Sequence, residues 1–279
     1  MRAVTTQNKP ERIAKVIARA GICSRREAER LIAAGRVSID GTRLDSPATN
    51  VRPGTIVTVD GTPLPVPEPA RLWRYHKPKG VITTARDPRG RPTVFSQLPS
   101  SLPRVLAIGR LDFNSEGLLL LTNDGAVKRR LELPSTGWTR RYRVRVHGRV
   151  DTDRLRTLAR GMRIDGITYG PMEAQLERQA GANAWLNVAL KEGKNREVRR
   201  VLEHIDLTVN RLIRVAYGPF QLGHLAPGSV REIPGKALRE QLGEDTVPRK
   251  TRADRDRASR SHANRTHANR THANRRRPA

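Results

Sequence analysis

Residues 109–125 read Gly-Arg-Leu-Asp-Phe-Asn-Ser-Glu-Gly-Leu-Leu-Leu-Leu-Thr-Asn-Asp-Gly. A polar turn precedes the apolar run Leu118–Leu121, and the turn residues at 123–125 follow it. Four leucines bounded by turns are too short for a typical helix and fit a strand buried on both faces. The end of such a strand is a rigid place to hold the carboxylate of Asp112. An aspartate before an apolar run is weak evidence alone, and a purely structural turn is the alternative.

The whole string is more specific than any of its parts. Arg110-Leu111-Asp112, followed by Ser115-Glu116-Gly117 and the leucine run, resembles the catalytic motif of the RsuA/RluB family of ribosomal RNA pseudouridine synthases. The resemblance implies an isomerase in which Asp112 is the nucleophile, and the sequence leaves open whether Asp112 attacks the base or the sugar or removes a sugar proton. It also implies an α+β fold, in which a small N-terminal S4 RNA-binding domain of helices and short strands is linked to a mixed, mostly antiparallel sheet with flanking helices and a central cleft.

The charge of the chain indicates a polyanionic partner. Lys and Arg number 54 against 27 Asp and Glu, for a formal net charge of +27 over 279 residues. A compact chain this basic repels itself unless phosphates neutralise part of the charge, so RNA is the expected partner. An anionic membrane surface is the alternative, but no apolar run approaches the roughly 20 residues that span a bilayer, and no signal-peptide core is present. We expect a cytoplasmic protein that does not bind membranes.

The N-terminal part reads as two helices followed by strands. Apolar residues recur at helical spacing from Ile13, and Ser24 with Glu27 forms a candidate capping box for a helix from Arg25 to about Ala34. Strands are expected at residues 37–39 and 56–59. The string Ser-Arg-Arg-Glu-Ala-Glu-Arg-Leu-Ile-Ala-Ala-Gly-Arg-Val (residues 24–37) resembles an S4 RNA-binding domain.

Four arginines surround the second of these helices. Guanidinium groups suit phosphate oxygens, so the cluster is expected to hold an RNA backbone, although a solvated helix face is the alternative. The cluster consists of Arg25, Arg26, Arg30 and Arg36.

Changes in composition predict the domain boundaries. Residues 1–10 are expected to be disordered and residues 11–60 to form the S4 domain. Four prolines in residues 61–70 predict a semi-rigid spacer, and the catalytic domain is expected over 71–242. Residues 243–279 lack large apolar side chains and are expected to form a disordered basic tail. Its repeats carry His262, His267 and His272, which fix no ligand geometry, so no metal site is predicted.

Strands and helices alternate through the second domain. Strands are expected at 72–75, 81–84, 106–108, 140–147, 173–177, 185–190 and 212–215, and helices at 126–131 and 151–161. A basic turn between the first two strands would place Lys77 at a sheet edge, where it could bind RNA. Tyr142 shares a strand face with Val144 and Val146, which suggests a core residue. The family resemblance instead implies that Tyr142 stacks on a flipped base.

The densest basic segment of this domain is Lys-Glu-Gly-Lys-Asn-Arg-Glu-Val-Arg-Arg-Val-Leu-Glu-His (residues 191–204). A glycine after a strand and a helix starting near Asn195 would aim backbone amides at a bound anion, with Lys194, Asn195 and Arg196 facing the substrate. Arg196 and Arg199, three residues apart, would share the cleft side. The resemblance implies that Arg199 pairs with Asp112 and that Leu212 is an apolar cleft residue.

Isomerising uridine to pseudouridine requires few catalytic groups. No atom is gained or lost, so no redox cofactor is needed, and no water attacks, so neither a metal nor the second carboxylate of a glycosidase is needed. Glu116 is therefore interpreted as a turn anchor rather than an acid. The target base must leave its stack, and Arg110 is a candidate to occupy the vacated space.

These observations favour a monomeric enzyme acting on ribosomal RNA, with 23S rRNA or a large-subunit precursor as the expected substrate. Two alternatives stay open from the sequence. One is the same chemistry on 16S rRNA or transfer RNA. The other is a non-catalytic S4-domain factor that binds the ribosome, which would not need Asp112, Tyr142 and Arg199 to converge in one cleft.

Overall fold

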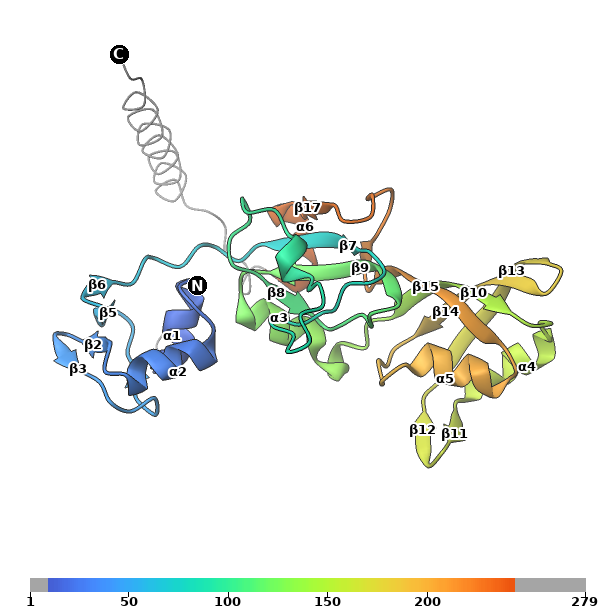
Figure 1. Ribbon diagram of the computed structural model, residues 1–279, viewed down its shortest axis with the longest axis horizontal. Coiled ribbons are helices and arrows are strands. Elements are labelled where there is room, and N and C mark those ends of the chain that lie inside the picture. Colours follow the sequence, from blue (N-terminus) through green and yellow to red (C-terminus); the bar gives the residue numbers. More distant parts are fainter. Residues whose placement is uncertain (1–9, 244–279) are drawn as a thin grey trace, which may run out of the picture.

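The computed structural model of the protein describes residues 10–243. The expected disordered segments, apart from residues 10 and 243, lie outside the described residues. The described chain contains two β-rich parts with flanking helices, joined by an extended segment (Figure 1). The expected mixed α+β architecture is therefore confirmed.

The N-terminal part packs two helices against a small sheet. The helices are α1 (Ile13–Arg19) and α2 (Arg25–Ala33). The sheet has the order β3-β2-β5-β6. Ser24 caps α2 as predicted, because its hydroxyl accepts from the Glu27 amide at 3.1 Å. Its strands are β2 (Val37–Ile39), β3 (Thr42–Arg43), β5 (Val57–Val59) and β6 (Thr62–Pro63), with β1 (Glu11–Arg12) and β4 (Asn50–Val51) paired separately.

A nine-stranded sheet dominates the rest of the chain. Its path is β13-β14-β10-β15-β9-β7-β17, with β16 on β15 and β8 on β9. All pairs are antiparallel except β15 with β9. The strands are β7 (Leu72–Lys77), β8 (Leu106–Ile108), β9 (Ser115–Thr122), β10 (Arg140–His147), β13 (Met172–Ala180), β14 (Asn183–Leu190), β15 (Thr208–Tyr217), β16 (Phe220–Gln221) and β17 (Val230–Glu232).

Helices cover both faces of this sheet. Apolar residues of α4 (Thr152–Thr157) and α5 (Glu197–His204) belong to a core on one face, and those of α3 (Gly125–Glu132) and α6 (Gly235–Leu242) to a core on the other. A separate hairpin pairs β11 (Met162–Ile164) with β12 (Ile167–Tyr169). The leucine run lies in β9 with Leu119 and Leu121 in the first core and Leu118 and Leu120 in the second. The predicted strand buried on both faces is confirmed.

One expected strand is absent. Residues 81–84 make a single bridge, Ile82 to Thr93, rather than a strand paired with β7. Strand β7 already pairs with β9 on one side and β17 on the other, so it offers no free edge for a hairpin. Thr83 instead donates its hydroxyl to the Leu111 carbonyl at 2.9 Å. The segment therefore supports the turn before β9.

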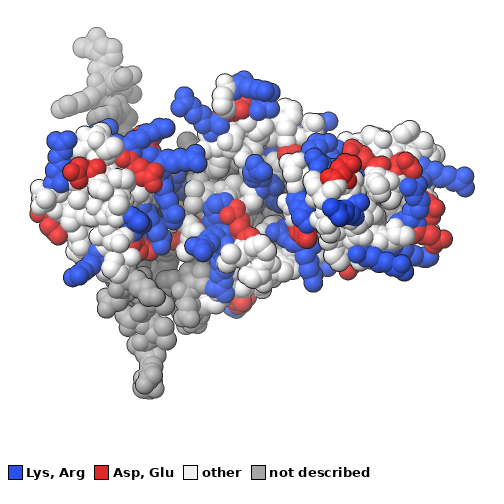
Figure 2. Space-filling view, turned by 90° about the horizontal axis from the view of Figure 1, so that it is seen from below, with Lys and Arg blue, Asp and Glu red and all other residues white. Residues whose placement is uncertain are grey.

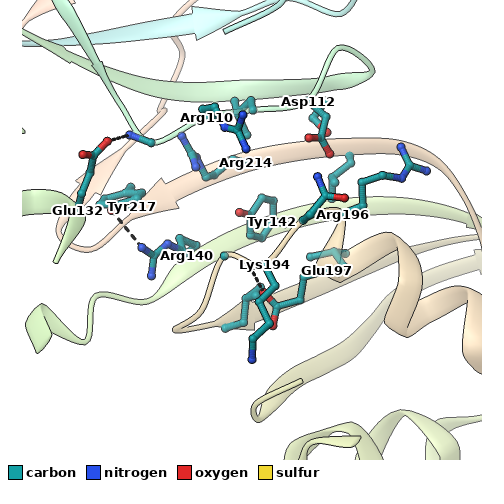
Figure 3. A pocket seen from close by; sticks show the side chains of 18 of the residues that line it. Arg110, Asp112, Glu132, Arg140, Tyr142, Lys194, Arg196, Glu197, Arg214 and Tyr217 are labelled. Atoms are coloured by element: carbon teal, nitrogen blue, oxygen red, sulfur yellow. Dashed lines mark hydrogen bonds between the residues drawn. The ribbon is translucent and has the colours of Figure 1, made fainter. Parts of the chain in front are cut away.

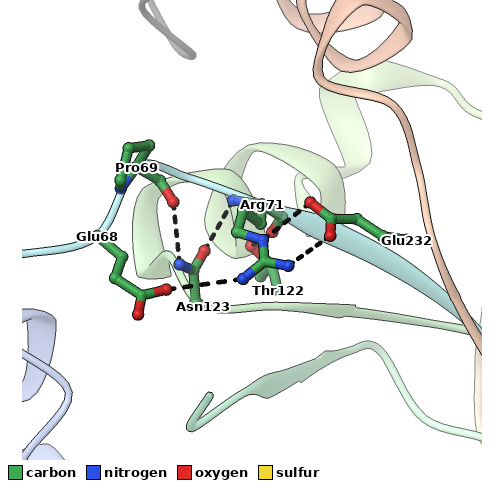
Figure 4. A network of polar contacts seen from close by, with 6 residues as sticks. All are labelled: Glu68, Pro69, Arg71, Thr122, Asn123 and Glu232. Carbon is green, nitrogen blue, oxygen red and sulfur yellow. Dashed lines mark hydrogen bonds and ion pairs between the residues drawn. The ribbon is translucent and has the colours of Figure 1, made fainter. Parts of the chain in front are cut away.

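The end of the proline-rich segment is fastened to the catalytic sheet (Figure 4). The Asn123 side chain accepts from the Arg71 amide at 2.8 Å and donates to the Pro69 carbonyl at 3.0 Å. Arg71 also pairs with Glu232, and its guanidinium lies 4.7 Å from the Trp73 ring centroid. At the other end, Pro63 and Thr62 pair with β5. The Leu64 amide donates to the Val57 carbonyl at 2.9 Å, so we place the spacer at residues 65–70, which is shorter than the segment expected from composition.

Candidate active site

A cavity of about 490 Å³ lies on the sheet face that carries α5. Strands β10 and β15 form its floor, and two loops form its walls: residues 109–114 before β9, and residues 193–196 before α5. Asp112 and Arg196 lie toward one end, Tyr142 in the middle, and Arg140, Tyr217 and Glu132 at the other end (Figure 3). The structure thus brings the predicted catalytic loop, strand and basic segment together.

Lys77 holds the loop that carries Asp112. Its ammonium group donates to the carbonyls of Asp112 and Pro78 at 3.0 Å and of Ser115 at 2.8 Å. Its side chain is completely buried, and burial lowers the pKa of Lys77 to about 8, against the raising influence of Asp112 and Glu116. The expectation that Lys77 binds RNA at a sheet edge is wrong, because β17 covers that edge and the amine is occupied beneath the loop.

A glycine sets the distance between β9 and β15. Gly117 has φ of +101°, and a Cβ atom there would lie 2.3 Å from the Arg214 carbonyl oxygen. Gly117 is therefore required both by its backbone conformation and by the close approach of β15. This contact explains the glycine in the Ser-Glu-Gly part of the sequence motif.

The floor of the cavity is formed by side chains from one sheet face. Tyr142 on β10 lies directly opposite Arg214 on β15, and Leu212 lies two residues before Arg214 on the same strand face. Tyr142 is 9% exposed and Leu212 6% exposed. Both predicted residues therefore present an aromatic and an aliphatic surface to the cavity.

The wall before α5 contains an unusual backbone conformation. Arg196 adopts φ of +53° and is the N-cap of α5, so the helix begins at Glu197 rather than near Asn195. A left-handed non-glycine residue costs about 1–3 kcal/mol and is typical of functional sites. Arg196, Asn195 and Lys194 all line the cavity, as expected. The Lys194 ammonium, however, donates to the Thr168 carbonyl at 2.7 Å and pairs with Glu192.

Arg199 lies beneath the cavity and not in it. Its guanidinium donates to the Val209 carbonyl at 2.8 Å and to the Asn114 carbonyl at 3.1 Å, and burial lowers its pKa. Within residues 10–243 it forms no ion pair with Asp112. The expected pairing is therefore not a direct ion pair, although the charge of Asp112 raises the pKa of Arg199 against the lowering by burial. Arg196 and Arg199 do not share the cleft side, because helical spacing does not apply across a left-handed residue. Arg199 instead ties the turn after Asp112 to β15.

Three carboxylates line the cavity, and two of them are engaged. Glu132 accepts from the Gly109 amide at 2.6 Å and pairs with Lys128. Glu197 accepts from the Lys194 amide at 2.8 Å, and burial raises its pKa. The Asp112 carboxylate has no hydrogen-bond or ion-pair partner among the described residues. Asp112 is therefore the carboxylate that is available to react.

Comparisons with known proteins agree with this geometry. A family model described as RNA pseudouridylate synthase matches residues 71–204, and an S4 domain model matches residues 11–57. An uncharacterized RNA pseudouridine synthase of Rickettsia felis is 50% identical over 230 residues, which cover 82% of this chain and 100% of the relative. This chain belongs to the RNA pseudouridine synthase family. It is therefore an isomerase that forms pseudouridine in RNA.

Two further similarities extend over most of the chain. Ribosomal large subunit pseudouridine synthase B of Salmonella typhimurium is 45% identical over 218 residues, covering 76% of this chain and 75% of the relative. A solved structure described as a pseudouridylate synthase superposes with a TM-score of 0.58 and 25% identity, covering 83% of this chain and 99% of that chain. The N-terminal domain and the sheet thus occur together in relatives of this synthase.

Glu116 anchors the synthase motif from the opposite side of the strand. Its carboxylate pairs with the Arg211 guanidinium through two contacts of 2.9 Å, and it does not line the cavity. This arrangement agrees with a structural role rather than an acid role.

The S4 arginines differ in their availability. Arg36 forms a two-contact ion pair with Asp60 at 2.6 and 2.7 Å, and Arg30 pairs with Glu27 at 3.0 Å. Arg25 and Arg26 are exposed, and neither makes an ion pair within residues 10–243. Basic side chains are abundant over the face seen in Figure 2, on both the S4 domain and the catalytic domain. Arg25 and Arg26 are the better candidates for phosphate contacts.

Several cavity residues were not predicted from the sequence. They include Arg214, which lies two positions after Leu212, so strand alternation could have placed it on the same face. Arg140 lies two positions before Tyr142 and could have been placed in the same way. Tyr217 gives no such signal, because its contact depends on the β10–β15 register: Arg140 donates to the Tyr217 hydroxyl at 3.1 Å.

Two observations limit other site types. Among residues 10–243, no three or more His, Cys, Asp or Glu side chains are grouped so that they could hold a metal ion. In the same residues, no helix has the length and apolar character needed to cross a membrane.

Proposed function

We propose that this synthase isomerises a specific uridine of 23S ribosomal RNA, with Asp112 as the nucleophile acting on a flipped-out nucleotide. The observation that carries the proposal is the unengaged Asp112 carboxylate, because Glu132 and Glu197 in the same cavity are bound to backbone amides. A nucleophile needs free oxygen lone pairs, and rigid support from Lys77 and Arg199 holds it in place.

The cavity can hold a nucleotide that has left its RNA helix. A base entering it would rest on Tyr142 and Leu212 with Asp112 above the sugar. Exposed Arg110 and Arg196 at the rim are suited to the flanking phosphates or to the gap left in the RNA. Unstacking the target costs a few kcal/mol, which phosphate contacts from the rim and from the S4 domain would offset.

The choice of RNA rests on similarity and not on the cavity. The relative from Salmonella typhimurium is named a large-subunit enzyme, and its similarity over both domains supports the same RNA class here. The S4 domain would then select the site by contacts away from the cavity. We further propose that the enzyme acts as a monomer in the cytoplasm, since one chain contains the complete set of cavity residues.

Pseudouridine mapping of total RNA tests the proposal. Cells lacking the protein are compared with cells complemented by the wild type or by Asp112→Asn. We expect one 23S position to lose pseudouridine, to regain it with the wild type and to stay unmodified with the variant. A lost position in 16S rRNA or transfer RNA would refute the target, and rescue by Asp112→Asn would refute the nucleophile.

A further inference from the structure

Arg214 is a buried cation at the cavity wall without a carboxylate partner. Its side chain is 3% exposed and lines the cavity. In the part of the chain that the structure describes, it forms no ion pair. Its Nε donates to the Leu118 carbonyl at 2.7 Å, whereas its buried Nη2 has no hydrogen-bond partner. A buried charge of this kind is costly unless something compensates it.

The surroundings of the guanidinium are fixed. Leu118 and the Tyr217 ring hold it, with its central carbon 5.3 Å from the ring centroid. Arg140 contacts the same ring at 4.9 Å, so the tyrosine already interacts with a second cation. Gly117, the β9 neighbour of Arg214 in the sheet register, has no side chain that could shield or neutralise it. A ligand in the cavity that carries a hydrogen-bond acceptor can therefore supply the missing partner of Nη2.

We propose that Arg214 binds a carbonyl oxygen of the target uracil and stabilises the negative charge that develops on the base during the reaction. This proposal rests on the proposed site for the flipped base. Tyr142 is the cross-strand neighbour of Arg214, and Leu212 is its neighbour along the strand, so a base resting on those two residues lies beside the guanidinium. Arg110 and Arg196 are exposed at the rim, where phosphates remain. The buried position of Arg214 suits the base instead.

The chemistry needs such a group. When the C1′–N1 bond breaks, its electron pair stays on the base and spreads over N1, O2 and O4. The C5–C1′ bond then forms from an electron pair of the base, C5 loses its proton and N1 ends with one, so the composition is unchanged. Guanidinium nitrogens only donate, and uracil carbonyls only accept, so the two match. A buried donor aimed at developing charge is typically worth about 10²–10³ in rate.

The test measures single-turnover rates with a stem-loop RNA that contains the mapped uridine. We expect the single-turnover rate of Arg214→Gln to be about 10²–10³-fold lower than that of the wild type. Its RNA affinity should stay within about threefold of the wild-type affinity. Arg214→Lys should react at least about tenfold faster than Arg214→Gln. Arg74→Gln is the matched control. Arg74 also donates to a backbone carbonyl, that of Gln221 at 2.9 Å, but does not line the cavity.

Sulfur substitution in the RNA separates binding of the base from a structural role. RNA with 2-thiouridine or 4-thiouridine at the target carries a poor acceptor at one position. We expect one of these to slow the wild type but to cause no further slowing in Arg214→Gln, since the contact is already lost. The proposal is overturned if neither thio-substituted RNA slows the wild type. It is also overturned if both slow Arg214→Gln by the same factor as they slow the wild type. An inactive wild type on unmodified RNA would refute the proposed function itself.

Discussion

Raising the pH from 7 to 9 should slow this enzyme about tenfold through Lys77 without unfolding it. The three carbonyls around the Lys77 amine match the three hydrogens of an ammonium group, and two of those carbonyls belong to Asp112 and Ser115. A neutral amine has two hydrogens and must point a lone pair at one carbonyl. Deprotonation therefore loosens the loop that positions the nucleophile.

The size of the effect follows from the pKa of Lys77, which burial lowers to about 8. The ammonium fraction falls from about 0.9 at pH 7 to about 0.1 at pH 9, a loss of roughly tenfold. Stability changes in the other direction. The unfolded chain keeps the ordinary pKa of 10.5, so between pH 8 and 10.5 it binds more protons than the folded chain. This difference raises the free energy of unfolding by up to about 3 kcal/mol as the pH rises.

Single-turnover rates between pH 6 and 10, with melting temperatures at each pH, check this expectation. The wild type should show a basic limb near pH 8. Lys77→Met should be slower at pH 7 and flat across this range, whereas Lys79→Met, at an exposed position, should keep the limb. The reasoning fails if the wild-type rate is constant to pH 9.5 or if Lys77→Met retains the same limb.

Three other outcomes are expected. Asp112→Asn should abolish isomerisation while RNA affinity stays within about tenfold, or about 1.4 kcal/mol, and turnover near the wild-type rate would remove Asp112 as nucleophile. Replacing Arg25 and Arg26 with Ala should reduce the log-log salt slope of RNA binding by about one per lost phosphate contact, and an unchanged slope would contradict their assignment. Gly117→Ala should destabilise the protein by several kcal/mol more than Gly90→Ala. Both glycines have positive φ, but only a Cβ atom at position 117 would clash with backbone atoms. Equal melting temperatures for the two variants would disprove the clash.

Local patterns predicted the elements whose periodicity and boundaries are clear. The leucine run, the Ser24 cap and the alternation through Tyr142 were all sufficient, because each reports a local preference that the fold retains. Residues 81–84 have an equally strand-like pattern, yet both edges of β7 are taken by strands distant in sequence. No local sequence pattern indicates that distant strands will pair with both edges of β7.

Sequence reasoning placed a site residue correctly where its position depends on one segment of the chain. It misplaced residues whose role depends on contacts between two segments. The family resemblance grouped Asp112, Tyr142 and Leu212, and the structure places all three around one cavity. Lys77 and Arg199 are basic residues in polar segments, and sequence alone does not distinguish an exposed phosphate ligand from a buried donor to carbonyls. Their roles depend on the turn at Asn114, which long-range pairing brings above them.

The spacer is fastened at both ends, so it limits the distance between the S4 domain and the catalytic domain. Residues 65–70 run between the Leu64 contact with β5 and the Asn123 and Arg71 contacts. An extended proline-rich chain rises about 3.1 Å per residue, so their reach is about 19 Å. Two RNA-binding surfaces joined at that length can be occupied together only on an RNA whose folded shape presents both sites within that reach. The target uridine would then be chosen partly by its distance from a second RNA feature, and a loosened spacer would relax that choice without altering any residue that touches the base.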